Sequence, residues 1–181
     1  MKISLRNNKT ATFRQINRHD RKALYNYLQQ LSAESRSRFG PHSFDRTTIN
    51  SIIDQPDTTI HRYVAIDDLT GDMIAYMLIK QGMIEFDYPR YAARNQFFDD
   101  ATTVTFAPSV ADSWQSTGLG SAMASFIEAN LSDRRIKTII LWGGVQATNT
   151  KAVNFYKKLG YQFIASFRHD EKDNYDMVKE L

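Results

Sequence analysis

Apolar residues recur along the chain with two different spacings, which predict alternating strands and helices. Short runs rich in β-branched and aromatic residues, such as TATFRQI at residues 10–16, are typical of strands. Leu24, Tyr27, Leu28 and Leu31 instead return every three or four positions, which places them on one face of a helix. The predicted order is βααβββαβαββ, with elements at residues 10–16, 17–31, 45–54, 62–67, 73–81, 102–110, from QSTGLG to about 131, 138–145, 149–159, 161–167 and 174–180.

This order predicts one α/β domain. Strands and helices alternate in the second half, which favours a mixed sheet with helices on both faces. A chain of 181 residues with 42% hydrophobic and 24% charged residues has the length and composition of a single globular core, so we expect one domain over residues 1–181. Pro108 lies inside a predicted strand and has no amide hydrogen to donate, so it marks an edge, a bulge or a splayed strand.

Composition excludes several kinds of chemistry. The chain has no Cys, so disulfides, thiolate metal sites and cysteine nucleophiles are excluded. The four histidines, His19, His42, His61 and His169, show no metal-binding spacing, so we expect no metal. No apolar run is long enough to cross a bilayer and the start lacks a signal-peptide pattern, so the expected location is cytoplasmic, without a membrane partner.

Charge distribution argues against a nucleic-acid partner. The formal net charge is +3, but no run of Lys and Arg exceeds two adjacent residues. A surface that binds a phosphate backbone needs such residues clustered on one face. Residues 67–112, by contrast, carry 3 basic and 8 acidic side chains, a net charge of −5.

The hexapeptide QSTGLG, at residues 115–120, has the pattern of an anion site. Glycines let backbone amides approach a ligand, and the start of a helix favours negative charge. A Walker A loop is excluded because Ser121 and Ala122 follow Gly120, and a dinucleotide fingerprint is excluded because Met123 replaces its third glycine. A glycine-rich helix start without a ligand has the same pattern, so the hexapeptide alone leaves both interpretations open.

A second motif follows at a fixed spacing. Asn149, Tyr156 and Gly160 occur in the run NTKAVNFYKKLGY, with Tyr161 directly after the glycine. Together with VADSWQSTGLGSAMASFIEANL, this run resembles the GNAT superfamily of N-acetyltransferases. The resemblance implies a mixed, mostly antiparallel sheet that splays between its central strands, acetyl-CoA as cosubstrate, and acetyl transfer to an amine.

The resemblance also implies which residues bind and react. The pantetheine arm is expected against the backbone of the strand that contains Pro108, and the pyrophosphate at the hexapeptide. The implied acetyl-CoA contacts are Ser109, Val110, Ala111, Gln115, Ser116, Thr117, Gly118, Leu119, Gly120, Ser121, Asn149 and Lys158. Tyr156 takes the family position of the proton donor to the leaving thiolate; without the motif, a tyrosine at the core edge explains it equally well. Exposed lysines such as Lys158 are also often only solvated charges.

The general base is open. Many family members carry a Glu on the central strand where this chain has Thr105. Four carboxylates that are near in sequence are candidates: Glu85, Asp87, Asp99 and Asp100. For each of them the alternative is an ordinary solvated loop residue. A water chain is a further candidate for the base.

The same segment suggests an acceptor. Its acidic residues alternate with aromatic ones, which attract cations by field and by cation–π contact; these are Phe86, Tyr88, Tyr91, Phe97 and Phe98. We expect a cationic amine such as a polyamine, an aminoglycoside or a lysine side chain, with the alternative that the rings simply pack the loop onto the sheet. The residues Trp142-Gly143-Gly144 are expected either to wall the acyl site or to form a core bulge, and His42 to lie on the substrate side or in a turn.

The sequence thus predicts an N-acetyltransferase that works by direct attack in a ternary complex, because no Cys or Ser/His pairing signals a covalent intermediate. Its acceptor is a small-molecule amine or a protein lysine or N-terminus, and the protein is a monomer or a homodimer. A module that binds acyl-CoA without catalysis is the alternative from another class.

Overall fold

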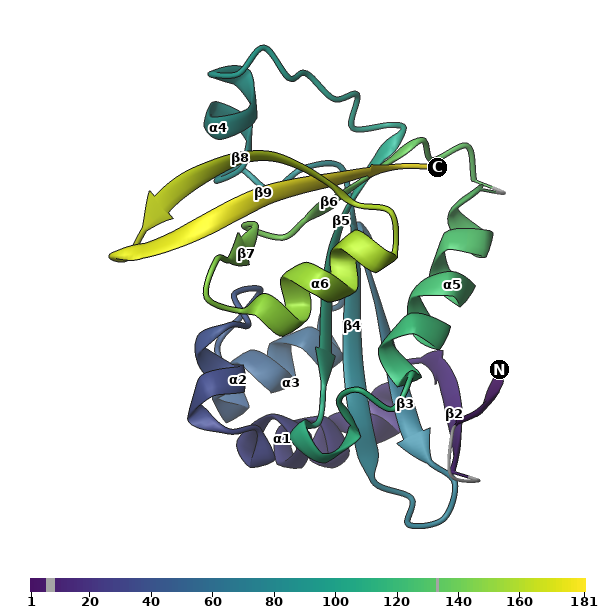
Figure 1. The fold of residues 1–181 in the computed structure, drawn as a ribbon. Coiled ribbons are helices and arrows are strands. Elements are labelled where there is room, and N and C mark those ends of the chain that lie inside the picture. The colour runs from purple at the N-terminus through teal and green to yellow at the C-terminus, as the bar shows by residue number, and fades with distance from the viewer. Residues whose placement is uncertain (6–8, 133) are drawn as a thin grey trace. The chain divides into compact units, whose positions relative to one another are not determined.

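The computed structural model describes residues 1–5, 9–132 and 134–181 and is drawn in Figure 1. Its contacts group these residues into two compact units. The first unit comprises Met1–Ile79 and Ala107–Ser125, and the second comprises Lys80–Phe106 and Phe126–Leu181. Strands β4 (Met73–Gln81) and β5 (Thr103–Val110) and helix α5 (Leu119–Ser132) contribute residues to both units. The single domain over residues 1–181 stays a prediction.

The first unit is built on antiparallel strands. In chain order these are β1 (Lys2–Ser4), β2 (Thr10–Gln15), β3 (Ile60–Asp67) and β4, and each is a neighbour of the next in the sheet. β2 pairs with β3 from Ala11 opposite Asp67 to Gln15 opposite Tyr63. Because side chains alternate along a strand, Ala11 and Phe13 point into the core while the residues between them are more exposed.

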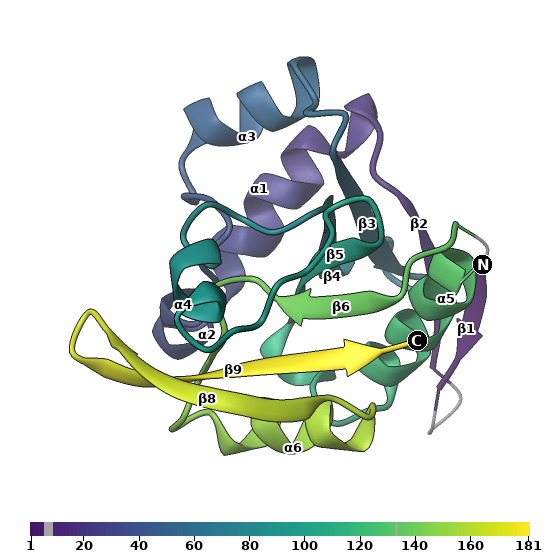
Figure 2. The same ribbon diagram turned by 90° about the horizontal axis from the view of Figure 1, so that it is seen from above.

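Three helices complete the first unit: α1 (Arg21–Gln30), α2 (Ala33–Ser37) and α3 (Arg46–Asp54). Leu24, Tyr27 and Leu28 form the buried face of α1, as the helical spacing predicts. α1 lies beside α3 (Figure 2), where the Arg21 guanidinium donates to Asn50 Oδ1 at 3.0 Å.

The second unit combines one parallel strand pair with antiparallel ones. β5 pairs in parallel with β6 (Thr138–Leu141) from Thr103 to Phe106, and β6 pairs antiparallel with β9 (Lys172–Glu180). β9 also pairs antiparallel with β7 (Val145–Gln146) and with β8 (Gln162–His169). The predicted fold class, a mixed α/β fold with a mostly antiparallel sheet, is therefore confirmed.

Two helices flank the β8–β9 hairpin of the second unit. Figures 1 and 2 show α4 (Tyr88–Ala92) on one side of the hairpin and α6 (Thr150–Lys158) on the other. Strand alternation explains the arrangement, because Met177 lines a cavity beside α6, whereas its neighbour Asp176 pairs with Arg90 of α4.

The structure contains elements that the apolar pattern does not predict, namely β1, α2, α4 and β7. α2 and α4 have five residues each, too few to show a helical period. The run at residues 138–145, predicted as one strand, is interrupted because Gly143 (φ 65°) and Gly144 (φ 73°) adopt left-handed conformations, and β7 follows as a separate strand. Within the described residues, no helix has the length and apolarity needed to cross a membrane.

Candidate active site

The residues predicted to bind acetyl-CoA divide between the two units. The first unit holds those from Ser109 to Ser121, and the second holds Asn149, Tyr156 and Lys158. Each group is built by its own local structure.

In the first unit, the chain between β5 and α5 makes a tight connection. β5 ends at Val110, a short 3-10 turn spans Asp112–Trp114, and α5 begins at Leu119. Ser116 (φ 64°) and Gly118 (φ 94°) both adopt left-handed conformations, which is uncommon for a serine. The Thr117 hydroxyl donates to the Trp114 carbonyl at 2.7 Å and holds the turn closed.

This connection leaves backbone donors unpaired at the start of α5. Among the described residues, no group accepts a hydrogen bond from the amides of Thr117, Gly118, Gly120 or Ser121; helical bonding begins where Ala122 N donates to Gly118 O at 3.0 Å. The positive end of the helix dipole adds to these N–H groups over a helix of 14 residues. The arrangement favours a bound phosphate.

Asp112 ties this connection to the start of α2. Its Oδ2 accepts from Ser32 N at 3.0 Å, and its Oδ1 accepts from the hydroxyls of Ser32 at 2.9 Å and Ser35 at 2.6 Å. Burial favours the protonated carboxyl, but the hydrogen bonds from Ser35 and Ser32 outweigh it and lower the pKa of Asp112. Gln115 Nε2 reaches the Val110 carbonyl at 3.3 Å, so it bridges the two ends of the connection.

The end of β5 is also held by side chains and backbone. The hydroxyls of Ser109 and Tyr27 lie 2.8 Å apart, which joins the strand to α1. The Ala111 amide donates to the Ile74 carbonyl at 2.8 Å, so this one of the predicted backbone contacts is already used within the protein. The Leu119 side chain is wholly buried, so only its backbone remains for a ligand.

In the second unit, two motif residues have clear local roles. Asn149 is the N-cap of α6, where its Oδ1 accepts from Ala152 N at 3.2 Å. Tyr156 is buried about two turns further along, with its ring 5.3 Å from that of Tyr161. Burial raises the pKa of Tyr156, so its hydroxyl stays protonated at neutral pH. Lys158 is exposed near the end of the helix.

Thr105, which stands where the resemblance implies a base in many family members, cannot act as one. Thr105 is wholly buried, and its hydroxyl donates to the Gly82 carbonyl at 2.8 Å. A hydroxyl that is already committed to a buried carbonyl has no basicity to offer an amine at neutral pH.

The four candidate carboxylates differ in their surroundings. Glu85 and Asp99 are exposed, and Asp99 accepts from Ala101 N at 2.9 Å. Asp100 accepts from Met83 N at 3.1 Å and from the Tyr88 hydroxyl. Asp87 is 0% exposed and pairs with Arg90 at 2.7 Å, so its interpretation as an ordinary solvated loop carboxylate is wrong.

The aromatic residues of this segment split into two groups. Tyr91 is buried with its ring 5.3 Å from that of Phe98, and both pack into the core of the second unit, as the packing interpretation predicts for them. Phe86, Tyr88 and Phe97 remain exposed. Among the described residues, no three His, Asp or Glu side chains converge as a metal site requires.

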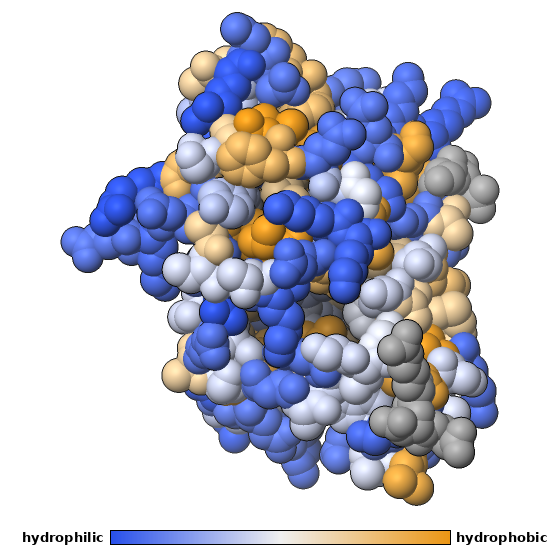
Figure 3. All heavy atoms as spheres, viewed as in Figure 1, coloured by the Kyte–Doolittle hydropathy of each residue, from blue (hydrophilic) through white to orange (hydrophobic). Residues whose placement is uncertain are grey.

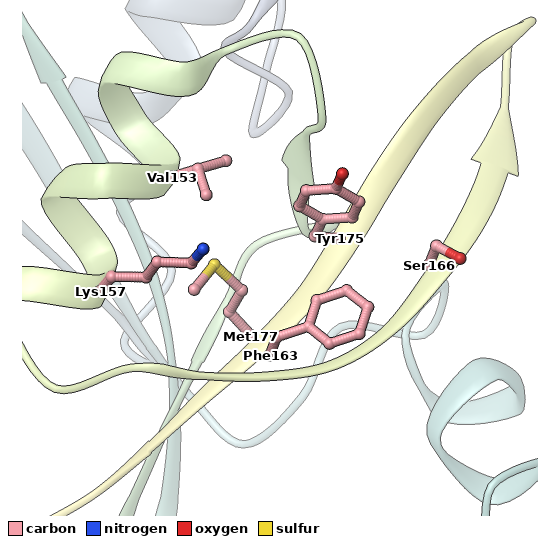
Figure 4. A pocket seen from close by; sticks show the side chains of 6 residues that line it. All are labelled: Val153, Lys157, Phe163, Ser166, Tyr175 and Met177. Carbon is pink, nitrogen blue, oxygen red and sulfur yellow. The ribbon is translucent and has the colours of Figure 1, made fainter.

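A cavity of about 380 Å³ lies between α6 and the β8–β9 hairpin. In the space-filling view, an apolar patch is visible among polar side chains at this cavity (Figure 3). Figure 4 shows the Lys157 side chain extending along the cavity. Its lining residues are Val153, Lys157, Phe163, Ser166, Tyr175 and Met177.

A mixed sheet whose β5–α5 connection presents backbone amides without acceptors among the described residues at a helix start suits a ligand that contains phosphate. The chain belongs to the GNAT acetyltransferase family: the family model described as Acetyltransferase (GNAT) family matches residues 24–161. The reaction of this family is acetyl transfer from acetyl-CoA to amines. No curated protein matches the chain in a sequence search.

Solved structures share the fold. The GNAT domain of S. lividans PAT is 21% identical with a TM-score of 0.77, covering 100% of this chain and 96% of that one. The ribosomal-protein-S18-alanine N-acetyltransferase from Escherichia coli is 19% identical with a TM-score of 0.66, covering 94% and 93%. AAC(6′)-Ib, in complex with paromomycin and acetyl-CoA, is 17% identical with a TM-score of 0.71, covering 94% and 93%. At these identities the likeness shows the fold.

Sequence reasoning missed the residues that support these groups. Asp112 precedes the motif, and its partner Ser32 lies between the helices predicted at residues 17–31 and 45–54. The Ser32 N-cap, whose hydroxyl accepts from Ser35 N at 3.2 Å, is the one sequence signal for α2. Arg90 and Asp176 form no sequence motif, because they come together only through the fold.

We expect Asp112→Asn to weaken acetyl-CoA binding about tenfold, which is about 1.4 kcal/mol. The amide keeps the shape of the side chain but loses one of two oxygens that accept from α2, so the connection before α5 is held less firmly. Isothermal titration calorimetry measures the change. Glu34→Gln, on exposed α2 surface where Glu34 pairs with Arg38, is the matched control and should bind as the wild type does. Equal affinities for wild type and Asp112→Asn contradict this role.

Proposed function

We propose that the protein transfers an acetyl group from acetyl-CoA to a primary amine by direct attack within a ternary complex. The observation that carries the proposal is that the amides of Thr117, Gly118, Gly120 and Ser121 at the start of α5 have no acceptor among the described residues, because such a set suits a pyrophosphate. Membership of the GNAT family supports the same reaction. The absence of Cys is consistent with direct transfer and with a reducing compartment, and we propose a cytoplasmic location.

The chemistry balances without a covalent enzyme intermediate. The amine nitrogen attacks the thioester carbonyl, a C–N bond forms, the C–S bond breaks, and one proton leaves the nitrogen while the CoA thiolate gains one. An alkyl ammonium has a pKa near 10.4, so proton removal must precede attack. Since Thr105 offers no base, a carboxylate of residues 85–100 or a water chain takes this proton in our proposal.

Tyr156 is proposed to stabilise the departing thiolate by a hydrogen bond. A thiol has a pKa near 8.5, below that of a tyrosine, and burial raises the pKa of Tyr156 further. Full proton transfer from Tyr156 to the thiolate is therefore uphill, whereas a hydrogen bond donated to developing negative charge lowers the barrier. The role comes from the family position, and the protonated, buried hydroxyl is consistent with it.

The acceptor is proposed to carry extra positive charge. Glu85 and Asp99 are exposed, and so are the rings of Phe86, Tyr88 and Phe97 in the same segment of the chain, a combination that attracts cations. Asp87 does not contribute, because Arg90 neutralises it. Among the structural neighbours, AAC(6′)-Ib was solved with paromomycin, while the Escherichia coli enzyme is named for a ribosomal protein, so small molecules and proteins both stay candidates.

A non-catalytic acyl-CoA-binding module is the second candidate function. The observation that favours it is Thr105, which stands buried and hydrogen-bonded where many family members carry a glutamate. Such a module would bind acetyl-CoA without turning it over, so binding and turnover must be measured separately.

Acetyl-CoA is expected to raise the Tm, because ligand at about 100 times its Kd adds about 2.7 kcal/mol, or about 5–11 °C for a chain of this size. Gly118→Ala should remove a few degrees of this shift, because alanine at φ 94° strains the turn although nothing lies within 4 Å of the new methyl group. Gly40→Ala, with open space and no positive φ, is the matched control. ATP and NAD serve as ligand controls. No shift with millimolar acetyl-CoA and folded protein refutes the proposed site.

A panel of amines tests the acceptor. Spermidine, kanamycin and a lysine-containing peptide should be acetylated with kcat/KM at least tenfold above that of uncharged-tail amines such as butylamine, because each carries additional positive charge. Release of CoA thiol measures turnover, and raising the salt concentration should reduce the difference. Equal rates across the panel contradict a cationic acceptor, and acetylation of lysate proteins alone assigns a protein substrate.

Tyr156→Phe should lower kcat about 100-fold with the best amine of this panel, since it removes one donor to the developing thiolate. The Kd of acetyl-CoA should stay within twofold, because the ring and its packing remain. Tyr161→Phe removes the hydroxyl of the buried tyrosine next to it and is expected to leave kcat unchanged. Binding of acetyl-CoA without turnover of any amine by the wild type supports the non-catalytic module instead.

A further inference from the structure

Arg90 of the second unit is the centre of a buried polar network. Its Nη2 donates to Asp87 Oδ1 at 2.7 Å and to Asp176 Oδ1 at 2.8 Å, and its Nη1 donates to the Phe86 carbonyl at 2.9 Å. The guanidinium carbon lies 3.9 Å from the Phe167 ring centre and 4.5 Å from that of Phe86. One arginine thus joins α4, the residues before it, and the β8–β9 hairpin.

Such a network is a costly way to gain stability. Asp87 and Asp176 are 0% and 1% exposed, and taking three charges out of water costs several kcal/mol per ion before their attraction repays it. Two carboxylates share one guanidinium, so one negative charge is not balanced within the network when both are ionised. Apolar residues of equal volume serve packing as well. What the network supplies that apolar residues cannot is directed hydrogen bonding.

One of those bonds leaves the network and reaches the turn at residues 142–144. Gly143 N donates to Asp87 Oδ2 at 3.4 Å. Phe167, which stacks on Arg90, also encloses the next residue, because a Cβ built on Gly144 would lie 2.8 Å from the Phe167 ring and from the Tyr175 carbonyl. Both glycines of the turn have positive φ, so its shape depends on these neighbours as well as on its own backbone.

The turn lies beside β5 where the β5–β6 pairing ends. Trp142 N donates to the Phe106 carbonyl at 3.0 Å, directly after the last paired residues, Phe106 and Leu141. From the sequence, the residues Trp142, Gly143 and Gly144 are expected either to wall the acyl site of the proposed function or to form a core bulge.

We propose that Asp87, Arg90 and Asp176 are positioning residues that hold the turn at residues 142–144 as a wall of the acceptor site. Asp87 acts through the Gly143 amide and is neither the general base nor an attractor of the cationic acceptor. The assignment of the wall to the acceptor rests on the proposed function; the support of the turn does not.

The protonation of Asp87 gives the network a measurable signature. Burial raises the pKa of Asp87 to about 6, with Arg90 opposing the shift and Asp176 adding to it. The charged and titratable groups around it are Arg90 and Tyr91 of α4 and Asp176 of β9. Because the folded pKa exceeds the ordinary value of 3.8, ionising Asp87 costs folding stability progressively from about pH 4 to pH 6. Below pH 6 the neutral carboxyl holds Gly143 and Arg90 less strongly.

Trp142 reports on the turn directly. The chain has two Trp, so a ¹⁵N-labelled sample shows two indole N–H signals, which a Trp114→Phe variant assigns. In the wild type we expect the Trp142 signal to titrate with a midpoint near pH 6. In Asp87→Asn that titration should vanish, and at pH 7.5 the signal should lie near the acidic position of the wild type. Asp173→Asn is the matched control, because Asp173 is exposed on β9, where it pairs with Arg168. In this variant the Trp142 signal should titrate as it does in the wild type.

His169 needs its own control. Its ring centre is 4.6 Å from that of Phe86, whose carbonyl accepts from Arg90, so this ring also lies near the network. The His169→Gln variant should keep the Trp142 midpoint. Loss of the midpoint in His169→Gln, with its persistence in Asp87→Asn, overturns the assignment to Asp87.

Arg90→Lys gives a second test that does not depend on the folding of Asp87→Asn. A lysine keeps the charge but cannot hold two carboxylates and the Phe86 carbonyl with one planar group. We expect the Trp142 signal to move and the KM of the best amine to rise about fivefold or more, with the KM of acetyl-CoA within twofold. Arg168→Lys is the control.

The outcomes separate the two proposals. A Trp142 signal identical to the wild type in folded Asp87→Asn and Arg90→Lys overturns the support of the turn. A moved signal with unchanged amine KM overturns the wall but keeps the support. If the protein neither binds nor uses acetyl-CoA, the proposed function fails, and the Trp142 measurement still decides whether the network holds the turn.

Discussion

The need to keep backbone N–H groups unpaired at the start of α5 constrains much of the first unit. A folded chain normally satisfies its amides with backbone, side chains or water, and an exposed helix start leaves donors facing solvent or ligand. Keeping them in a defined direction requires the left-handed residues Ser116 and Gly118 and the Thr117 hydroxyl bond. Asp112 holds this connection in place, because its carboxylate accepts hydrogen bonds from the Ser32 and Ser35 hydroxyls at the start of α2. α2 is thus tied directly to the candidate ligand loop.

In the second unit, the turn at residues 142–144 contains two glycines, which by themselves allow many backbone conformations. Gly143 and Gly144 permit the chain to leave β6 and enter β7, but glycine loses more conformational entropy on folding than any other residue. The surrounding groups reduce that freedom: Asp87 accepts from Gly143, and Phe167 closes on Gly144. Buried charge is tolerated here because each carboxylate meets the guanidinium at hydrogen-bonding distance.

Local patterns predicted the elements with a sustained period and missed the short ones. The spacing in α1 and the alternation in β2 and β3 are properties of single segments, so the sequence contains them directly. α4 has Pro89 in its first turn and only five residues, and the β6–β7 interruption depends on two φ angles within an apolar run. The sequence left Asp87 open between a candidate base and a solvated carboxylate. Arg90 and Asp176 lie 3 and 89 positions away from it, and only the fold shows that Asp176 is near.

The motif residues illustrate why a family pattern carries both folding and chemistry. Asn149 caps α6, Leu119 fills the core beneath the start of α5, and Gly118 supplies a backbone angle that other residues rarely adopt. Each of these roles alone explains why that residue type is present. Tyr156 is different, because its buried ring packs against Tyr161 through contacts that Phe would also make. Of the motif residues, Tyr156 is therefore the one whose chemistry is least explained by folding and best explained by a bound reactant.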